Sequence, residues 1–229
     1  MTYEEFTRSE AARRRYWARS FVGWRVIGEA EPNRGHCAVA ELENAGRLSG
    51  IVTQNVDGLQ QVAGATSVIE LHGNLAAVVC LSCQALTARV ELDRRLRSLN
   101  PRWEAALGAT RPDGDAVVAD EAVAAFNVAD CSSCGGVLKP DVVFFGESVP
   151  KARVQQCFAI LESSAVLLVV GSSLQVMSGF RFVLRASKIG IPVVIVNQGE
   201  TRGDQLATVR IDAPLGGSLP QMAEQLIAS

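Results

Sequence analysis

The sequence predicts an α/β fold in which an open parallel sheet carries a small inserted metal-binding module. Three observations support this prediction: strands alternate with helices, several strands are apolar throughout, and two Cys-x-x-Cys pairs flank a block of different character. Strands that alternate with helices form parallel sheets, and strands that helices cover on both faces lack polar alternation. The metal module is then an insertion into the sheet domain.

The predicted elements follow the chain in this order. Amphipathic patterns predict helices, and short apolar runs predict strands. The helices are expected at 3–19, 34–46, 150–163, 178–188 and 217–228, and the strands at 48–53, 67–71, 141–145, 165–171, 192–197 and 208–211. Between them, residues 80–138 contain the cysteine pairs, an exposed helix RVELDRRLRSL and the turn-rich stretch RPDGDAVVADEA. We therefore predict a sheet domain of residues 1–79 and 139–229, with a module of residues 80–138 inserted.

Composition excludes several classes of protein. The chain has 229 residues, of which 48% are hydrophobic and 20% charged, so it can form one domain with a sizeable core and a smaller appendage. A net charge of −2 argues against a general nucleic-acid-binding surface. No apolar run is long enough to span a membrane and no signal peptide is visible, so we expect a cytoplasmic protein without a membrane partner.

The cysteine pairs indicate a metal site. Cys-x-x-Cys spacing lets both thiolates of a pair reach one tetrahedral ion, and four such ligands leave no open position for catalysis. We predict one structural zinc ion per chain, with a disulfide or redox pair as the alternative, held by Cys80, Cys83, Cys131 and Cys134. The remaining cysteines, Cys37 and Cys157, are expected to be small core residues.

Three predicted strands end in polar or small residues, in the sequences IVTQN, LLVVGSSL and VVIVNQG. Ligands of open α/β sheets bind at the carboxyl ends of the strands, and glycine and serine there let backbone N–H groups approach a phosphate at a helix start. Each motif alone is more typical of a helix cap or turn. Together they favour a nucleotide-sized pocket.

The two histidines differ in context. His72 follows a predicted strand in ELHGN, where it is either a structural residue or a general base whose pKa lies near the working pH. His36 lies at a helix start and is expected to be structural.

Several short motifs occur along the chain in an order that resembles a known family. The segments TQNVDGL, ELHG, both cysteine pairs, LKPDVVFFGE, VVGSSLQV and VIVNQGETRGDQLA closely resemble those of the sirtuins, NAD-dependent protein-lysine deacylases. PDGD, SLQVMSGFRF and ETRGDQLA resemble the class II branch in particular. The resemblance implies a Rossmann-like sheet that binds NAD, a small zinc-binding module and a tunnel for an acylated lysine.

The resemblance also implies roles for individual residues. His72 would be the catalytic base that takes a proton from a ribose hydroxyl, while the acyl group passes from lysine to ADP-ribose and nicotinamide is released. Residues 142–147 would pair with the substrate backbone as an added strand, with Val143, Phe144, Phe145, Gly146 and Glu147 as substrate-binding residues. The implied NAD-binding residues are Gln54, Asn55, Val56, Asp57, Gly171, Ser172, Ser173, Asn197, Gln198, Gly199 and Leu215.

The sequence departs from the sirtuin pattern in two places. The first strand, its Gly-Ala-Gly-x-Ser loop and the following Pro-Asp-Phe-Arg or Pro-Asp-Tyr-Arg segment do not occur in residues 1–229, and Gln60 stands where the family usually has histidine. The sequence is then expected to be a fragment, to start at a misplaced codon or to be a natural truncation that lost activity. The chain as given is expected to bind NAD poorly or not at all.

Several functions remain open at this stage. The leading one is protein-lysine deacylation, with protein ADP-ribosyl transfer and a non-catalytic binding module as alternatives. Tyr16 and Arg19 have the Tyr-x-x-Arg spacing with which some class II members bind acidic acyl groups, although a helix packed on the core also explains them.

Overall fold

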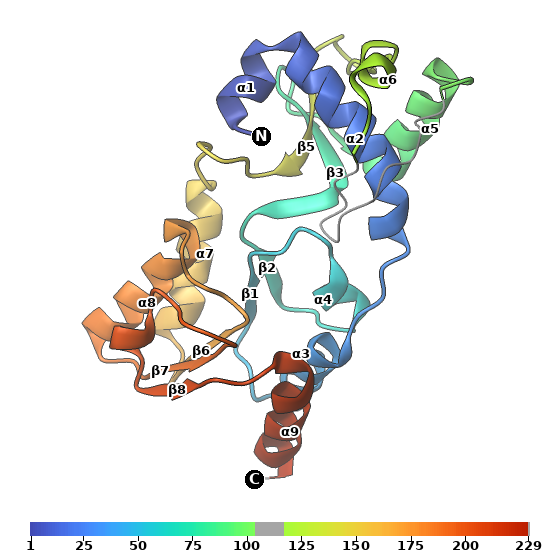
Figure 1. Cartoon of the computed structure of the whole chain (residues 1–229). Helices are drawn as coiled ribbons and strands as arrows, with labels where there is room; N and C mark the ends of the chain where they lie inside the picture. The colour runs from blue at the N-terminus through green and yellow to red at the C-terminus, as the bar shows by residue number, and fades with distance from the viewer. Residues whose placement is uncertain (104–116, 229) are drawn as a thin grey trace. The chain divides into compact units, whose positions relative to one another are not determined.

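The computed structural model describes residues 1–103 and 117–228 as two compact units. Unit 1 comprises residues 1–30, 56–58 and 73–148, and unit 2 comprises residues 31–55, 59–72 and 149–229. Figure 1 gives the element labels. The PDGD motif at 112–115 lies outside the described residues. Among the residues described, no helix is both long and apolar enough to cross a membrane.

Unit 1 places helices around a small antiparallel sheet. Its strand order is β4-β3-β5, and both pairings are antiparallel. The elements are α1 (Tyr3–Arg8), α2 (Glu10–Gly28), β3 (Gly73–Cys80), β4 (Leu86–Ala88), α5 (Arg89–Leu99), α6 (Asp120–Ala124) and β5 (Leu138–Val142).

The N-terminal helices belong to unit 1, whereas residues 1–79 were predicted to belong to the sheet domain. The physical reason is their apolar face. Trp17 and Phe21 of α2 pack in one core cluster with Leu92 of α5 and with Phe126. The aromatic rings of Phe21 and Phe126 lie 5.6 Å apart, within the range of favourable aromatic pairs.

Four predicted elements of unit 1 need correction. The helix expected at 3–19 is two helices, because the extended residue Ser9 ends α1 and its side chain accepts the Ala12 N–H to cap α2. Helix α5 is not simply exposed, since it buries one face. The last residues of the turn-rich stretch begin α6, which runs from Asp120 to Ala124. The strand expected at 141–145 ends at Val142.

Unit 2 contains the parallel strands that the sequence predicts. Strand β1 pairs with β2, and β6, β7 and β8 form a second parallel sheet in that order, with α7 and α8 beside it in Figure 1. The described strands of unit 2 thus form two parallel sheets, where the sequence predicted a single one. The elements are α3 (Arg34–Asn44), β1 (Ile51–Thr53), α4 (Leu59–Val62), β2 (Val68–Glu70), α7 (Lys151–Glu162), β6 (Leu167–Val170), α8 (Met177–Ile189), β7 (Val193–Val196), the 3-10 helix η1 (Asp204–Leu206), β8 (Val209–Ile211) and α9 (Leu215–Ala228).

Two apolar clusters hold unit 2 together. One lies between α7, α8 and the strands and contains Cys157, which is buried as expected. The other lies where α3 packs on α9 and includes Leu42 and Leu219. Cys37 of α3 is exposed, so the expectation that it is a core residue is wrong. His36 has the structural role expected, because its Nδ1 accepts the Asn33 N–H at 3.1 Å and completes a capping box.

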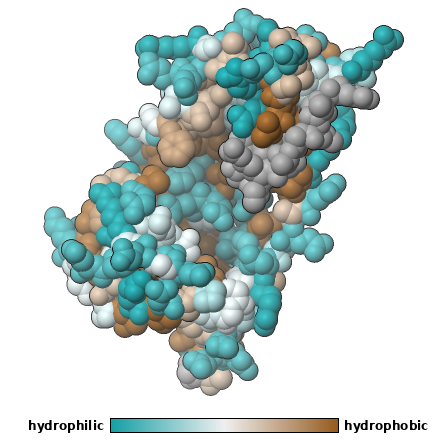
Figure 2. Space-filling model, in the orientation of Figure 1, coloured by the Kyte–Doolittle hydropathy of each residue, from teal (hydrophilic) through white to brown (hydrophobic). Residues whose placement is uncertain are grey.

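The visible surface in Figure 2 is mostly hydrophilic, with scattered hydrophobic patches. Exposed apolar side chains such as Val62, Leu86 and Phe145 come from different elements. Single exposed apolar residues are normal on protein surfaces. The two candidate sites below are therefore built from specific side chains rather than from one large apolar face.

Candidate active site and metal centre

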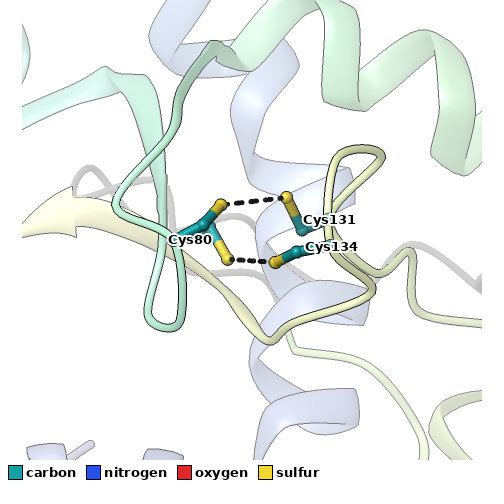
Figure 3. Close-up of side chains that lie close together, drawn as sticks. Cys80, Cys131 and Cys134 are labelled. Carbon is teal, nitrogen blue, oxygen red and sulfur yellow. Dashed lines mark hydrogen bonds between the residues drawn. The ribbon is translucent and has the colours of Figure 1, made fainter.

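The four predicted zinc ligands come together in unit 1. The sulfur atoms of Cys80, Cys83, Cys131 and Cys134 all lie within 4.8 Å of one another. Cys80 Sγ is 3.5 Å from Cys134 Sγ, and Cys83 Sγ is 3.8 Å from Cys131 Sγ. Figure 3 shows the labelled sulfurs pointing toward one another. Thiolates about 2.3 Å from a tetrahedral ion lie about 3.8 Å apart, so this arrangement fits zinc.

Turns around the sulfurs explain why the sequence folds into this cluster. Gly135 has φ +72°, and its N–H donates to the Cys131 carbonyl oxygen at 2.9 Å. A Cβ at Gly136 would lie 2.5 Å from Ser82 Oγ and 3.0 Å from Cys80 Sγ, so a larger residue would displace a ligand. Backbone N–H groups of Cys83 and Ser82 lower the pKa of the Cys80 thiol to about 6, which favours the thiolate that binds metal.

The predicted catalytic histidine is held from both ring nitrogens in unit 2. His72 Nδ1 lies 3.1 Å from the Gln54 carbonyl oxygen, and Nε2 lies 2.7 Å from Ser178 Oγ. A carbonyl oxygen only accepts, so Nδ1 carries the proton in the neutral ring. The lone pair on Nε2 then faces a hydroxyl. This tautomer leaves Nε2 as the atom that can take a proton.

Burial lowers the pKa of His72 below its usual value near 6.5. The hydrogen bond to the Gln54 carbonyl opposes this shift, whereas the positive charges of Arg153 and Arg181 add to it. The ring is therefore neutral at pH 7 and can act as a base.

We expect NMR titration of the His72 ring in the free chain to give a midpoint below 6.5. The chain has only two histidines, so the His72 signal is identified by its loss in a His72→Gln variant. A midpoint above 6.5 would contradict the effect of burial and of the two neighbouring arginines.

Gln54 links the residues around His72. Its Nε2 donates to Ser172 Oγ at 2.8 Å, which joins the carboxyl end of β1 to the residues that follow β6. A Cβ at Gly179 would lie 2.6 Å from Gln54 Oε1, so a larger residue at this position of α8 would push the Gln54 carboxamide away from its present position. Ser178 and Gly179 had no assigned role in the sequence analysis, although the SGF segment of the SLQVMSGFRF motif contains both.

Besides Gln54, the predicted NAD-binding residues of unit 2 include the Gly-Ser-Ser segment that follows β6. Gly171 has φ +61°, and a Cβ there would lie 2.5 Å from Leu215 Cδ1, which places Leu215 against the end of β6. Ser172 Oγ also accepts the Leu174 N–H at 3.2 Å. Ser173 lies in the same loop. The Gly-Ser-Ser segment was expected to stand at a helix start, but this is wrong, because α8 begins only at Met177.

A turn after β7 holds the remaining group. Asn197 Nδ2 donates to the carbonyl oxygens of Gln198 and Gly199 at 3.0 and 3.1 Å. The Gly199 N–H donates to Asp212 Oδ1 at 3.0 Å, and Arg210 contacts both Gly199 and Asp212. Asp212 and Arg210 were not predicted to lie here, because no motif in the sequence points to them.

The TQNVD segment spans both units. Asn55, in unit 2, is exposed, and its N–H donates to Thr53 Oγ1 at 3.1 Å. Val56 and Asp57 belong to unit 1, where the Val56 carbonyl accepts the Leu75 N–H at 2.9 Å. The structure thus brings Gln54 to His72, Ser172 and Gly179 within unit 2.

The predicted substrate-binding segment follows β5 as a turn. Glu147 Oε2 accepts the Phe144 N–H at 2.9 Å and pairs with Lys139 Nζ at 3.0 Å, and Gly146 has φ +81°. The Phe145 carbonyl accepts the Tyr3 N–H, and Phe145 itself is 71% exposed. Val143 lines a cavity of unit 1 together with Phe144 and Phe145. These contacts fix the turn while leaving an aromatic side chain accessible.

Comparison with known proteins gives a consistent set of relatives. A family profile described as the Sir2 family matches residues 1–178. The chain is 54% identical over 226 residues to an NAD-dependent protein deacetylase 1 of Streptomyces coelicolor, covering 99% of this chain and 76% of that protein. It is 46% identical to the NAD-dependent protein deacylase Sirt4 of Drosophila melanogaster, covering 95% and 70%.

The fold of the chain is also similar to solved structures of Sir2 proteins. The fold matches a structure of Sir2Tm bound to a propionylated peptide with a TM-score of 0.79 and 27% identity, covering 100% of this chain and 84% of that one. It also matches a complex of Sir2 with a p53 peptide and NAD+ with a TM-score of 0.74 and 26% identity, covering 99% and 80%. The predicted Rossmann-like α/β fold is thus confirmed.

Proposed function

The chain belongs to the Sir2 family, and we propose that it is an NAD-dependent deacylase of lysine side chains in protein substrates. The observation that carries the proposal is the half-buried His72, whose Nε2 accepts a hydrogen bond at the carboxyl ends of the parallel strands. The relatives named above are deacetylases and deacylases, and a related structure contains an acetylated peptide.

The residues of unit 2 fit NAD. Gly171 and Gly199 have positive φ values that suit close backbone approach, and the hydroxyls and carboxamides at these strand ends suit phosphates and sugar hydroxyls. When bound, NAD would supply an electrophilic ribose carbon and a nicotinamide leaving group. Ser172, Asn197 and Leu215 would hold it on the adenosine and phosphate side, and Gln54 and Asn55 on the nicotinamide ribose.

His72 would act as the base in this site. Its Nδ1–H is fixed by the Gln54 carbonyl, so the ring cannot turn over without breaking that bond. A hydroxyl that takes the place of Ser178 Oγ at Nε2 would lose its proton to the ring, and the lowered pKa of His72 keeps the ring ready to accept it at neutral pH.

The zinc ion would have a structural role. Four thiolates fill a tetrahedral sphere and leave no open position to activate water. The ion would join the Cys80–Cys83 turn to the Cys131–Cys134 turn, which are far apart in sequence, and so fix β3 and β5 in unit 1.

The test is to incubate the chain with NAD and an acetyl-lysine peptide, then to follow nicotinamide by chromatography and the peptide by mass spectrometry. Deacylation predicts nicotinamide release only with peptide present, with the peptide losing its acetyl group. A peptide that gains ADP-ribose instead would establish ADP-ribosyl transfer. If neither product forms, the deacylase proposal is wrong for this chain.

A further inference from the structure

The turn after β7 is held through both backbone groups of one glycine. The Gly199 N–H donates to Asp212 Oδ1 at 3.0 Å, and the Gly199 carbonyl oxygen accepts from Arg210 Nη2 at 3.1 Å. Gly199 has φ +83°, and residues 198–200 are exposed. An exposed turn centred on a glycine would sample many conformations without such contacts. Arg210 and Asp212 therefore select one conformation of the turn.

Both side chains come from the strand next to β7. Strands β7 and β8 run parallel with Ile195 opposite Arg210, and the Asn197 N–H donates to the Ile211 carbonyl oxygen at 3.1 Å. Arg210 lies within β8, and Asp212 directly follows it. Because parallel strands end at the same edge of a sheet, the pairing of β7 with β8 brings both side chains to the turn.

Arg210 joins three acceptors with one guanidinium. Besides the bond to the Gly199 carbonyl, its Nη2 donates to Asp212 Oδ2 at 3.1 Å, and its Nε pairs with Asp204 Oδ2 at 3.0 Å. Asp204 is itself held, because it accepts both the backbone N–H and the hydroxyl of Thr201. The guanidinium has its donors in a fixed, planar fork, so these contacts fix its orientation.

The exposure of this charged cluster argues against a role in stability. The side chains of Arg210, Asp204 and Asp212 are 35%, 23% and 51% exposed. Ion pairs in contact with water contribute little to stability, because solvent and salt screen them. What the charges hold is the backbone of Gly199, from both its N–H and its carbonyl. Fixing the turn therefore explains the arrangement better than holding the fold.

The same cluster is connected to the loop after β6. The Arg202 N–H donates to the Ser173 carbonyl oxygen at 2.9 Å, and Arg202 Nη1 donates to the Gln175 carbonyl oxygen at 3.1 Å. Arg202 comes two residues before Asp204, so the segment that Asp204 and Arg210 anchor links the turn after β7 to the Gly-Ser-Ser loop. Both places are expected to bind the adenosine and phosphate side of NAD.

We propose that Arg210 and Asp212 are positioning residues for the cofactor, which preset the turn at Gly199 to receive the adenosine side of NAD. This inference rests on the proposed deacylase function and assigns two residues that no motif marks. A turn that is already fixed loses less conformational entropy when a ligand binds, so the ligand binds more tightly. The effect falls on cofactor affinity and not on proton transfer at His72, which Gln54 and Ser178 hold.

The experiment measures the binding of ADP-ribose to the full chain by isothermal titration calorimetry. ADP-ribose carries the adenosine and both phosphates, and its binding requires no turnover. Asp212→Ala removes the acceptor of the Gly199 N–H and is expected to weaken binding about tenfold, as is Arg210→Met, which removes the donor to the Gly199 carbonyl. Asp212→Asn keeps an oxygen that can accept the Gly199 N–H, so its affinity should stay within about threefold of wild type.

The matched control is Arg185→Gln. Arg185 pairs with Glu162 in the same unit, between α8 and α7, and its side chain is 38% exposed, similar to that of Arg210. This variant should bind ADP-ribose as wild type does, because it breaks an equally exposed ion pair that does not hold the turn.

Turnover separates positioning from a general loss of structure. With NAD and acetyl-lysine peptide, Asp212→Ala should raise the KM for NAD about tenfold and leave kcat and the KM for peptide within about twofold. The temperature of unfolding should match that of Arg185→Gln. A fall in kcat and in the unfolding temperature alongside the affinity would assign Asp212 a structural role and would overturn the proposal.

Four binding results would also overturn it: no binding of ADP-ribose to wild type, wild-type affinity in Asp212→Ala or Arg210→Met, equal losses in Asp212→Asn and Asp212→Ala, or an equal loss in Arg185→Gln. Failure of the deacylase function is recognised separately, because wild type would then bind ADP-ribose without releasing nicotinamide or changing the peptide.

Discussion

Replacing His72 with alanine is expected to lower deacylation by at least about a hundredfold, because a positioned general base contributes roughly 10²–10⁴ in rate. The variant loses Nε2, the ring nitrogen that can accept a proton while Nδ1 keeps its own proton and donates it to the Gln54 carbonyl. The measurement is the initial rate of nicotinamide release with acetyl-lysine peptide and NAD. Zinc content should stay at one ion per chain, since His72 lies in unit 2 and the cysteines in unit 1.

The matched control is His36→Ala, which removes the other histidine of the chain. His36 completes the capping box of α3 by accepting the Asn33 N–H, and the Asn33 cap itself remains, so the loss of His36 should lower stability by no more than about 1 kcal/mol and leave the rate within about twofold. If His72→Ala retained the wild-type rate, the assignment of His72 as the base would have to be abandoned. A loss of rate in His72→Ala but not in His36→Ala would show that the effect comes from the missing base and not from lower stability.

Replacing Cys131 with serine is expected to release zinc and to unfold much of unit 1. Cys131 is buried in the same core cluster as Trp17 and Leu138, and zinc binding to such sites is worth about 10–16 kcal/mol in apparent folding free energy. Three thiolates hold zinc more weakly than four. The measurements are metal content after dialysis against a mild chelator and near-ultraviolet circular dichroism, which reports on the packed tryptophans of unit 1.

Cys37→Ser is the control for this change, because Cys37 is an exposed thiol in unit 2. It should retain zinc and the wild-type spectrum. A full complement of zinc in Cys131→Ser after dialysis would show that Cys131 is not needed to hold the ion, and wild-type protein without zinc would favour the disulfide or redox alternative.

Local patterns were enough to locate most elements of unit 2. The apolar strands and their parallel pairing were predicted, because runs such as LLVV and VVIV are typical of strands buried beneath helices. The clustering of the four cysteines was also predicted, since Cys-x-x-Cys spacing limits the possible geometry so strongly. The boundaries were less accurate, as the early end of β5 at Val142 shows.

Contacts between distant segments could not be predicted in the same way. Ser178 and Gly179 reach His72 and Gln54 across more than 100 residues of sequence, and no local periodicity records that contact. The same holds for Asp212, whose carboxylate holds the turn after β7. The assignment of α1 and α2 to unit 1 depended on which apolar face they could bury.

By itself, the sequence determined the chemistry available to this protein: four thiols at metal-binding spacing, one histidine after a strand, and polar strand ends suited to a dinucleotide. Only the tertiary structure decided the direction of the His72 pKa shift and the atoms that hold its ring. Both depend on burial and on hydrogen-bond partners from other segments, which exist only once the chain has folded.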